Sequence, residues 1–186
     1  MPPHQPHATI TAMSHDHPAA PLTTYRLTFI PDYRLIFLND QDNDAGPGAS
    51  GVLNEAAQDV AASDGYTLVI TVAQDLLPVG VTVTISDTEP HPAPGVPQLR
   101  LECPSGQLAL GSPTGGGIPI HLVPGTYAAT VEHHGRDTAA TRRQEILHQY
   151  TSPDDLEALR NATPPTEQYT ITMWRTGDID DTEDDD

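Results

Sequence analysis

The feature that most constrains the fold is a series of short segments in which apolar and polar residues alternate, separated by proline and glycine. The clearest of them, VGVTVTIS at residues 79–86, places Val or Ile on one face and Gly, Thr or Ser on the other. This period-two pattern is typical of a strand with one buried face and one solvated face. The 19 prolines and 14 glycines punctuate the chain, which favours many short elements over a few long helices.

Similar segments predict the remaining strands. They cover residues 25–29, 33–38, 66–73, 98–103, 108–110, 118–122, 126–133 and 167–174. Pro124 and Gly125 suit the central positions of a type II turn, so we expect the strands on either side of them to pair as a hairpin. A set of about eight strands predicts a single all-β, mainly antiparallel domain, a β-sandwich or jelly-roll-like fold with one inserted helix.

The inserted helix is predicted to begin at Ser152. Ser152 suits the N-cap position and Pro153 the first helical position, and Asp154 and Asp155 complement the positive end of the helix dipole. Residues 52–62 and 142–150 also have helical character, and residues 39–51 are expected to form a polar loop.

The two ends of the chain lack the pattern of a folded domain. Residues 1–22 are rich in Pro, His, Ala and Thr without apolar periodicity, and we expect a disordered arm. Residues 177–186 hold seven acidic residues in ten positions, and we expect a disordered tail because like charges at close spacing repel. The folded domain is therefore predicted to span residues 23–176.

The charge balance narrows the choice of partners. There are 26 acidic residues against 8 basic ones, all Arg, and the formal net charge is −18. Such a chain repels nucleic-acid phosphates and anionic membrane surfaces, so we expect neither as a partner. A basic protein would be attracted instead. Two readings stay open: the acidity serves a basic partner, or it serves only solubility and reflects host composition.

The lone cysteine indicates the compartment. Cys103 has no second cysteine to pair with, which favours a reducing environment, and at the end of a predicted strand it is expected to be a buried, inert thiol. No stretch approaches the ~18 apolar residues of a membrane helix. The N-terminal residues have neither the cationic start nor the apolar run of a signal peptide. We therefore expect a soluble, cytoplasmic protein.

The histidines do not form a convincing metal site. Those near the N-terminus, including His15 and His17, lie in the expected disordered arm, where ligand geometry is not fixed. His133 and His134 are neighbours on a predicted strand and point to opposite faces, and in the expected hairpin His121 would lie far from them. We expect no metal and no cofactor.

Catalytic motifs are equally weak. There is no G-x-S-x-G, although a Ser/His/Asp triad can be recognised only by its geometry. The three glycines at 115–117 lack the Lys of a phosphate loop and are expected to form a flexible turn. Whether the chain is an enzyme stays open, and a non-enzymatic role is favoured.

One part of the chain resembles a known family. The segment from Ile118 to Asp137, IPIHLVPGTYAATVEHHGRD, resembles a pattern "hydrophobic-x-Pro-Gly-x-Tyr-x-x-x-Val…Gly-Arg-Asp" of small bacterial proteins, which ends in a strand of the type Glu-x-Tyr-x-x-x-x-Trp. Here that strand runs from Glu167 to Trp174. The group is similar to the competence protein J family, which implies a β-sandwich and a relation to an inhibitor of a DNA-entry nuclease. The matched residues are structural in character, and some thirty residues are inserted before Glu167, so no functional residue is carried over.

These observations lead to a functional hypothesis. We expect a non-enzymatic protein-binding domain, an immunity or inhibitor protein that masks a basic, nuclease-like partner. The alternatives are a structural or phage-derived assembly protein and an enzyme of unrecognised type. The carboxylates expected to contact the partner are Asp40, Asp42, Asp44, Asp154 and Asp155.

Overall fold

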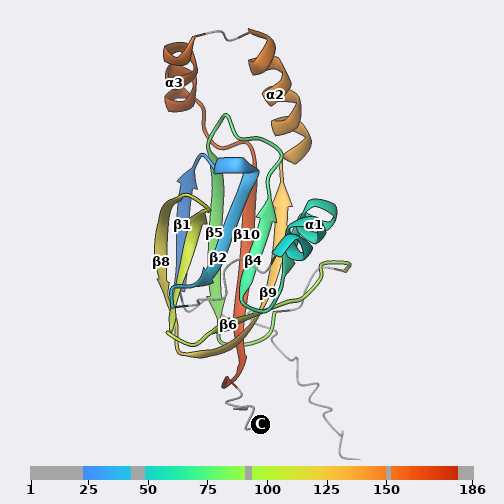
Figure 1. Ribbon diagram of the computed structural model, residues 1–186, viewed down its shortest axis with the longest axis vertical. Helices are drawn as coiled ribbons and strands as arrows, with labels where there is room; N and C mark the ends of the chain where they lie inside the picture. Colours follow the sequence, from blue (N-terminus) through green and yellow to red (C-terminus); the bar gives the residue numbers. More distant parts are fainter. Residues whose placement is uncertain (1–22, 43–48, 91–93, 150–151, 180–186) are drawn as a thin grey trace, which may run out of the picture.

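The chain forms a β-sandwich of two five-stranded sheets with three helices (Figure 1). The computed structural model describes residues 23–42, 49–90, 94–149 and 152–179. The first sheet has the order β1 (Thr23–Phe29), β5 (Val79–Ser86), β10 (Gln168–Gly177), β9 (Gly125–His134) and β6 (Leu99–Cys103). The second has the order β3 (Ala61–Ser63), β4 (Thr67–Thr71), β2 (Leu35–Asp40), β7 (Gln107–Ser112) and β8 (Gly115–His121). All pairs are antiparallel except β5 with β10, so the predicted fold class is confirmed.

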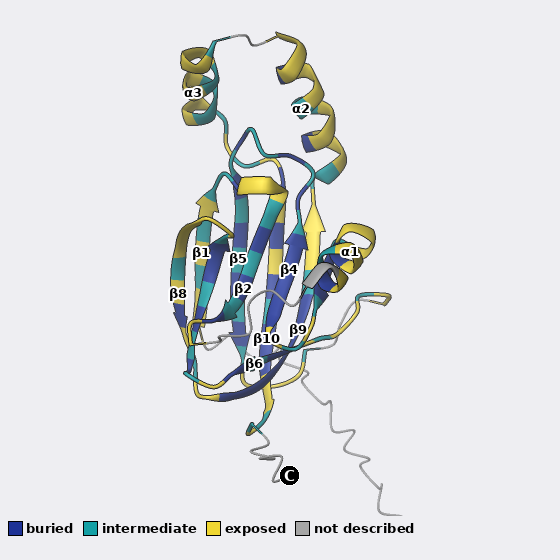
Figure 2. Ribbon diagram, viewed as in Figure 1, coloured by how far each residue is buried: buried dark blue, intermediate teal, exposed yellow. Residues whose placement is uncertain are grey.

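The core lies between the sheets and is built from the alternating apolar residues that the sequence presents. Along β5, Val79, Val81, Val83 and Ile85 are buried, while the residues between them are partly exposed. They pack in one cluster with inward residues of both sheets, and Figure 2 shows the resulting buried strands. The hydrophobic effect on this shared face explains why period-two segments assemble into two packed layers.

Side chains and main chain join the sheets at both edges of the sandwich. At one edge, Ser63 Oγ donates to the carbonyl of Arg100 across 2.5 Å, and the N–H of Glu102 donates to the carbonyl of Gly65 across 2.8 Å. At the other edge, the hydroxyl of Tyr25 donates to the carbonyl of His121 across 3.3 Å. These contacts occupy edge-strand groups that would otherwise offer pairing sites to other chains.

The expected hairpin around Pro124 and Gly125 is wrong. Strand β8 pairs with β7 in the second sheet, whereas β9 pairs with β10 and β6 in the first, so this turn carries the chain from one sheet to the other. His121 consequently lies opposite Gln107 of β7. The reason is that β8 already has its partner through the turn at residues 113–114. Gly115 and Gly116 follow this turn as the first residues of β8, with positive φ angles of 111° and 81°, so residues 115–117 begin a strand and do not form the flexible turn that was expected.

The described residues form three α-helices, in the regions where the sequence predicted one inserted helix and two further segments of helical character. Helix α1 (Ala49–Asp59) packs Val52 and Ala56 against the second sheet, and the chain then enters β3, where a helix to residue 62 was expected. Helix α2 (Arg136–Gln149) begins six residues before the predicted start at 142. Helix α3 (Pro153–Ala162) begins as predicted after Ser152, although the Ser152 side chain makes no capping hydrogen bond.

The first strand along the chain begins, and the last strand ends, close to the predicted domain limits, residues 23 and 176. Strand β1 begins at Thr23, and β10 ends at Gly177. The expected arm, residues 1–22, lies outside the described residues, as do residues 180–186 of the expected tail. Within the described ranges, no helix has the length and apolar character needed to cross a membrane.

Candidate functional site

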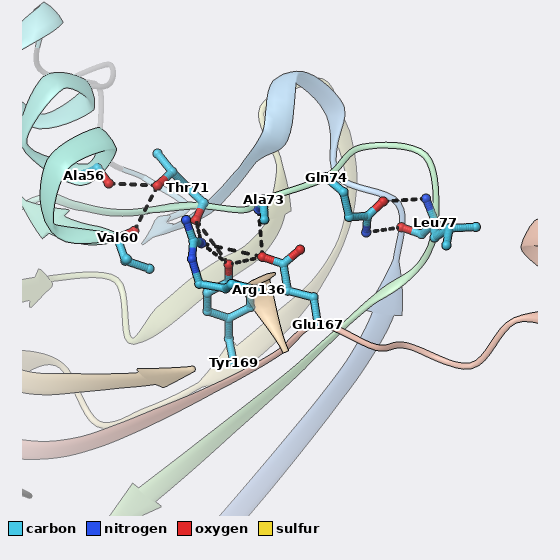
Figure 3. A network of polar contacts seen from close by, with 9 residues as sticks. All are labelled: Ala56, Val60, Thr71, Ala73, Gln74, Leu77, Arg136, Glu167 and Tyr169. Carbon is cyan, nitrogen blue, oxygen red and sulfur yellow. Dashed lines mark hydrogen bonds and ion pairs between the residues drawn. The ribbon is translucent and has the colours of Figure 1, made fainter. Parts of the chain in front are cut away.

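A buried polar cluster lies at the end of the sandwich from which α2 and α3 project. Gly135 and Arg136 follow the end of β9 here, and Glu167 and Tyr169 lie just before and within the start of β10. The two segments are separated by the whole α2–α3 excursion and meet in space, as Figure 3 shows. In the sequence pattern that resembles the competence protein J family, the first part ends at residues 135–137 and the second part begins at Glu167.

Glu167 is the centre of this cluster. Its side chain is fully buried, and its Oε1 accepts hydrogen bonds from the N–H of Ala73 (2.7 Å) and the hydroxyl of Tyr169 (2.5 Å). Nη1 of Arg136 lies 3.5 Å from the same oxygen. Within the described part of the chain, the second carboxylate oxygen, Oε2, has no hydrogen-bond partner. A buried carboxylate requires a compensating cation, and Arg136 supplies it.

Arg136 and Tyr169 extend the cluster to the second sheet. Nη1 of Arg136 donates to the carbonyl of Thr71 and to the Tyr169 hydroxyl, which itself lies 3.1 Å from the Thr71 carbonyl. The Thr71 hydroxyl donates to the carbonyl of Ala56 in α1 across 2.8 Å. Burial and the neighbouring Glu167 raise the pKa of Tyr169, so its hydroxyl stays protonated and remains a donor. The cluster therefore links α1, β4, the start of α2 and β10.

The α2–α3 excursion is held to the sandwich by a few polar contacts. Arg143 Nε lies 2.8 Å from Asp75 Oδ1, and Arg160 Nε donates to the carbonyl of Leu76 across 2.9 Å. Both acceptors belong to the loop between β4 and β5, which the buried Gln74 braces through hydrogen bonds to Leu77. Figure 2 shows both helices standing beyond the sheets with mostly exposed surfaces. We call this part of the molecule, with the turn before β2, the helical end.

The predicted partner-binding carboxylates are divided between opposite ends of the sandwich. Asp154 and Asp155 are exposed in the first turn of α3, at the helical end. Asp42 is exposed after β2. Strand β2 runs away from the helical end because its first residue, Leu35, pairs with Thr71 and its last residues pair toward Leu108. Asp44 lies outside the described residues.

Asp40 is buried in the fold, although the sequence analysis expected its carboxylate to contact a partner. Its side chain is fully buried, and its Oδ2 accepts hydrogen bonds from the N–H (3.0 Å) and hydroxyl (2.8 Å) of Ser105. Its Oδ1 accepts from the N–H of Asp42 across 2.9 Å. All of these donors come from the chain itself, so Asp40 joins two loops and presents no carboxylate to a partner.

Three candidate titrating residues of the described part are His133, His134 and Cys103. The His133 ring packs against Tyr169 with a centroid distance of 6.2 Å, and desolvation together with the Arg136 charge lowers the pKa of His133. His134 follows on the opposite face of β9. Cys103 is buried, and desolvation with a hydrogen bond to Asp40 raises its pKa to about 12. Among the described residues, no three His, Cys, Asp or Glu side chains are grouped so that they could hold a metal ion.

Comparison with known proteins supports the resemblance at the level of the fold. The sequence matches no protein-family model and no curated protein. The structure is similar to that of ComJ, inhibitor of the DNA-degrading activity of NucA, from Bacillus subtilis. The TM-score is 0.52 with 11% identity over 83% of this chain and 98% of ComJ. It is also similar to the crocagin biosynthetic gene J product, with a TM-score of 0.50 and 13% identity over 82% of this chain and 97% of the other. The chain shares its fold with both proteins.

Sequence reasoning missed the cluster around Glu167 as a site. The signal was present, because Gly135-Arg136 and Glu167-x-Tyr169 both belong to the quoted pattern. Only the folded chain shows that Arg136 and Glu167, some thirty residues apart in the sequence, form an ion pair.

Proposed function

We propose that this protein is a non-enzymatic inhibitor or immunity protein that binds a nuclease-like protein and masks it. The observation that carries the proposal is the similarity of nearly the whole ComJ structure to this chain. ComJ is an inhibitor of a DNA-degrading activity. Because identity is only 11%, the similarity establishes the fold, and the functional step is our proposal.

The surface charge supports a basic partner. The described part holds 18 acidic and 8 basic residues. Several arginines are already engaged by carboxylates of the chain, as in the pairs Arg100–Glu102, Arg142–Glu145 and Arg143–Asp75. Most carboxylates therefore have no arginine partner within the chain, and the surface carries a net negative charge. This charge raises the rate of encounter with a positively charged protein.

The helical end is the part of the surface that we assign to the partner. Asp154 and Asp155 lie there in an exposed first helical turn, and they would be accessible to basic side chains of the partner. Asp42, at the other end, contributes to long-range attraction only.

The test measures inhibition directly. A lysate of the source organism is fractionated on a cation exchanger, and each fraction is assayed for degradation of plasmid DNA with and without the purified full chain. We expect the chain to suppress the activity of at least one basic fraction at low salt, with weaker suppression at high salt because salt screens the attraction. If no fraction loses activity at low salt, the proposed function is wrong.

A matched pair of variants locates the contact. Asp154→Asn with Asp155→Asn removes two charges at the helical end, and Asp87→Asn with Glu89→Gln removes two exposed charges elsewhere. The first double variant should need more protein for half-inhibition than the second, although both have the same net charge. Equal effects would indicate that only overall charge matters.

A further inference from the structure

The turn before β2 presents an aromatic and a basic side chain in an unusual conformation. Tyr33 and Arg34 have φ angles of 55° and 59°, in the left-handed region that residues with a Cβ rarely adopt. Both side chains are exposed, and Tyr33 is 76% exposed, the highest value among the large hydrophobic residues described. Two consecutive residues of this kind cost free energy, and such strain is concentrated at functional sites.

Contacts on both sides hold this turn in place. The N–H of Asp32 donates to Ser112 Oγ across 2.8 Å, and the Asp32 carboxylate accepts from the hydroxyls of Ser112 and Thr114. On the other side, the N–H of Val72 donates to the carbonyl of Arg34 across 3.0 Å. The turn is thus fixed to the β7–β8 connection and to the end of β4, so Tyr33 and Arg34 are presented on a rigid support.

A pocket of about 340 Å³ opens beside the turn. Its apolar wall includes Leu35, Leu53 and Val72, and its charged residues are Arg34 and Arg136. No carboxylate is among the described residues that line it. In a chain with a net charge of −18, this is a local exception to the general acidity.

The two arginines retain unused hydrogen-bonding capacity. Within the described ranges, the Arg34 guanidinium makes no hydrogen bond or ion pair, and the contacts of Arg136 all pass through Nη1. A guanidinium carries five N–H donors in a planar fork that matches a carboxylate. The pocket can therefore accept an anionic group against an apolar wall.

We infer that this pocket binds a carboxylate side chain of the protein partner, with Tyr33 packing on the partner surface around it. This inference rests on the proposed function. A nucleic-acid phosphate is a poor occupant because the rest of the chain repels a polyanion, whereas a single carboxylate on a basic protein meets no such repulsion. A free small anion inside the pocket would leave most of the Tyr33 ring uncovered. Tyr and Arg are also the residue types that dominate binding energy at protein interfaces.

The first experiment uses the inhibited nuclease fraction with two variants that preserve the backbone. Tyr33→Asn and Arg34→Asn remove the ring and the charge, and Asn tolerates the left-handed conformation. Each should raise the concentration for half-inhibition roughly thirtyfold, the effect of losing one interface hot spot. The control is Arg26→Asn, which removes an exposed arginine on β1. It should change the concentration for half-inhibition less than about threefold. If both turn variants inhibit at the same concentration as the unaltered chain, the inference is wrong.

A second experiment does not depend on the nuclease. Benzoate is titrated into the full chain and the amide resonances are followed by NMR, with benzylamine and inorganic phosphate as separate probes. We expect benzoate to shift the resonances of residues 33–35 and 71–73, and to lose this effect in Arg34→Asn, while benzylamine shifts none of them. Absence of benzoate shifts, or stronger binding of phosphate than of benzoate, would overturn the carboxylate pocket. If benzoate binds there but no nuclease fraction is inhibited, the proposed function fails and the chemistry of the pocket stands.

Discussion

The hydroxyl of Tyr169 donates a hydrogen bond to Oε1 of Glu167, two residues earlier in the chain, across 2.5 Å. Both side chains are buried, and Arg136 Nη1 completes the cluster 3.5 Å from the same carboxylate oxygen. The contact lies where the α2–α3 excursion leaves and rejoins the sandwich, so it connects the stability of the core to the position of the helical end.

Replacing Glu167 should therefore destabilise the protein strongly. Glu167→Gln removes the charge that compensates Arg136 and places an amide among donors, and we expect a loss of about 3 kcal/mol in the free energy of unfolding. Urea denaturation measures it. The control is Glu102→Gln, which breaks the more exposed pair with Arg100 and should cost less than about 1 kcal/mol. Equal losses in the two variants would show that the buried cluster adds no more stability than a surface pair.

Asp40 should behave as a structural residue and not as a binding residue. Asp40→Asn presents an amide N–H₂ to the N–H and hydroxyl donors of Ser105 or of Asp42, and we expect a loss of about 2 kcal/mol in the free energy of unfolding. The exposed neighbour Asp42 serves as the control, and Asp42→Asn should change stability by less than about 0.5 kcal/mol. A folded Asp40→Asn variant with unchanged stability and reduced inhibition would contradict this assignment.

Gly135 should not tolerate a side chain. It has a φ of 79°, and a Cβ there would lie 2.0 Å from the carbonyl oxygen of Thr166. Gly135→Ala thus combines backbone strain with a clash against main chain, and we expect a loss of at least about 2 kcal/mol. The matched substitution Gly51→Ala lies in α1, where an added Cβ meets nothing within 4 Å, and should stabilise the protein by up to about 1 kcal/mol. Thermal unfolding of both variants measures these changes. A Gly135→Ala protein as stable as the unaltered chain would show that the backbone between β9 and α2 can shift.

Stability should fall in alkaline solution because of Cys103. Burial and the hydrogen bond with Asp40 raise the pKa of its thiol from 9.0 to about 12 in the folded protein. Below pH 9 the thiol is protonated in both states, so it has no effect. Between about pH 9 and 12 only the unfolded chain loses the proton, and stability should decrease by roughly 1 kcal/mol per pH unit.

The measurement is a set of urea midpoints from pH 8 to pH 11, compared with Cys103→Ala. The variant lacks the titrating thiol, so its midpoint should fall less steeply above pH 9, whatever its stability at pH 8. Tyr169, whose pKa is also raised, contributes to the decline of both proteins at higher pH. Parallel pH profiles for the two proteins would show that the thiol does not titrate differently in the folded and unfolded chains.

Much of the secondary structure was predictable because it depends on neighbouring residues. The alternation in residues 79–86 predicts β5 and its buried face, and Ser152-Pro153 predicts the start of α3. The fold class followed from the number of such strands. Local patterns predicted the ends of elements less well. Residues 61–62 were expected to continue a helix, but they belong to β3, because Ala61 and Ala62 are buried beside β4.

What the sequence by itself determined is thus the β-rich, acidic character of the chain and the faces of its best strands, because propensity and periodicity act over a few residues. Tertiary structure decided which strands pair. A Pro-Gly turn has the same local chemistry whether it closes a hairpin or, as between β8 and β9, joins two sheets. It also decided that Asp40 is buried and that Arg136 meets Glu167. Those outcomes depend on contacts between residues far apart in the chain, whose free energy appears only when both sheets have packed.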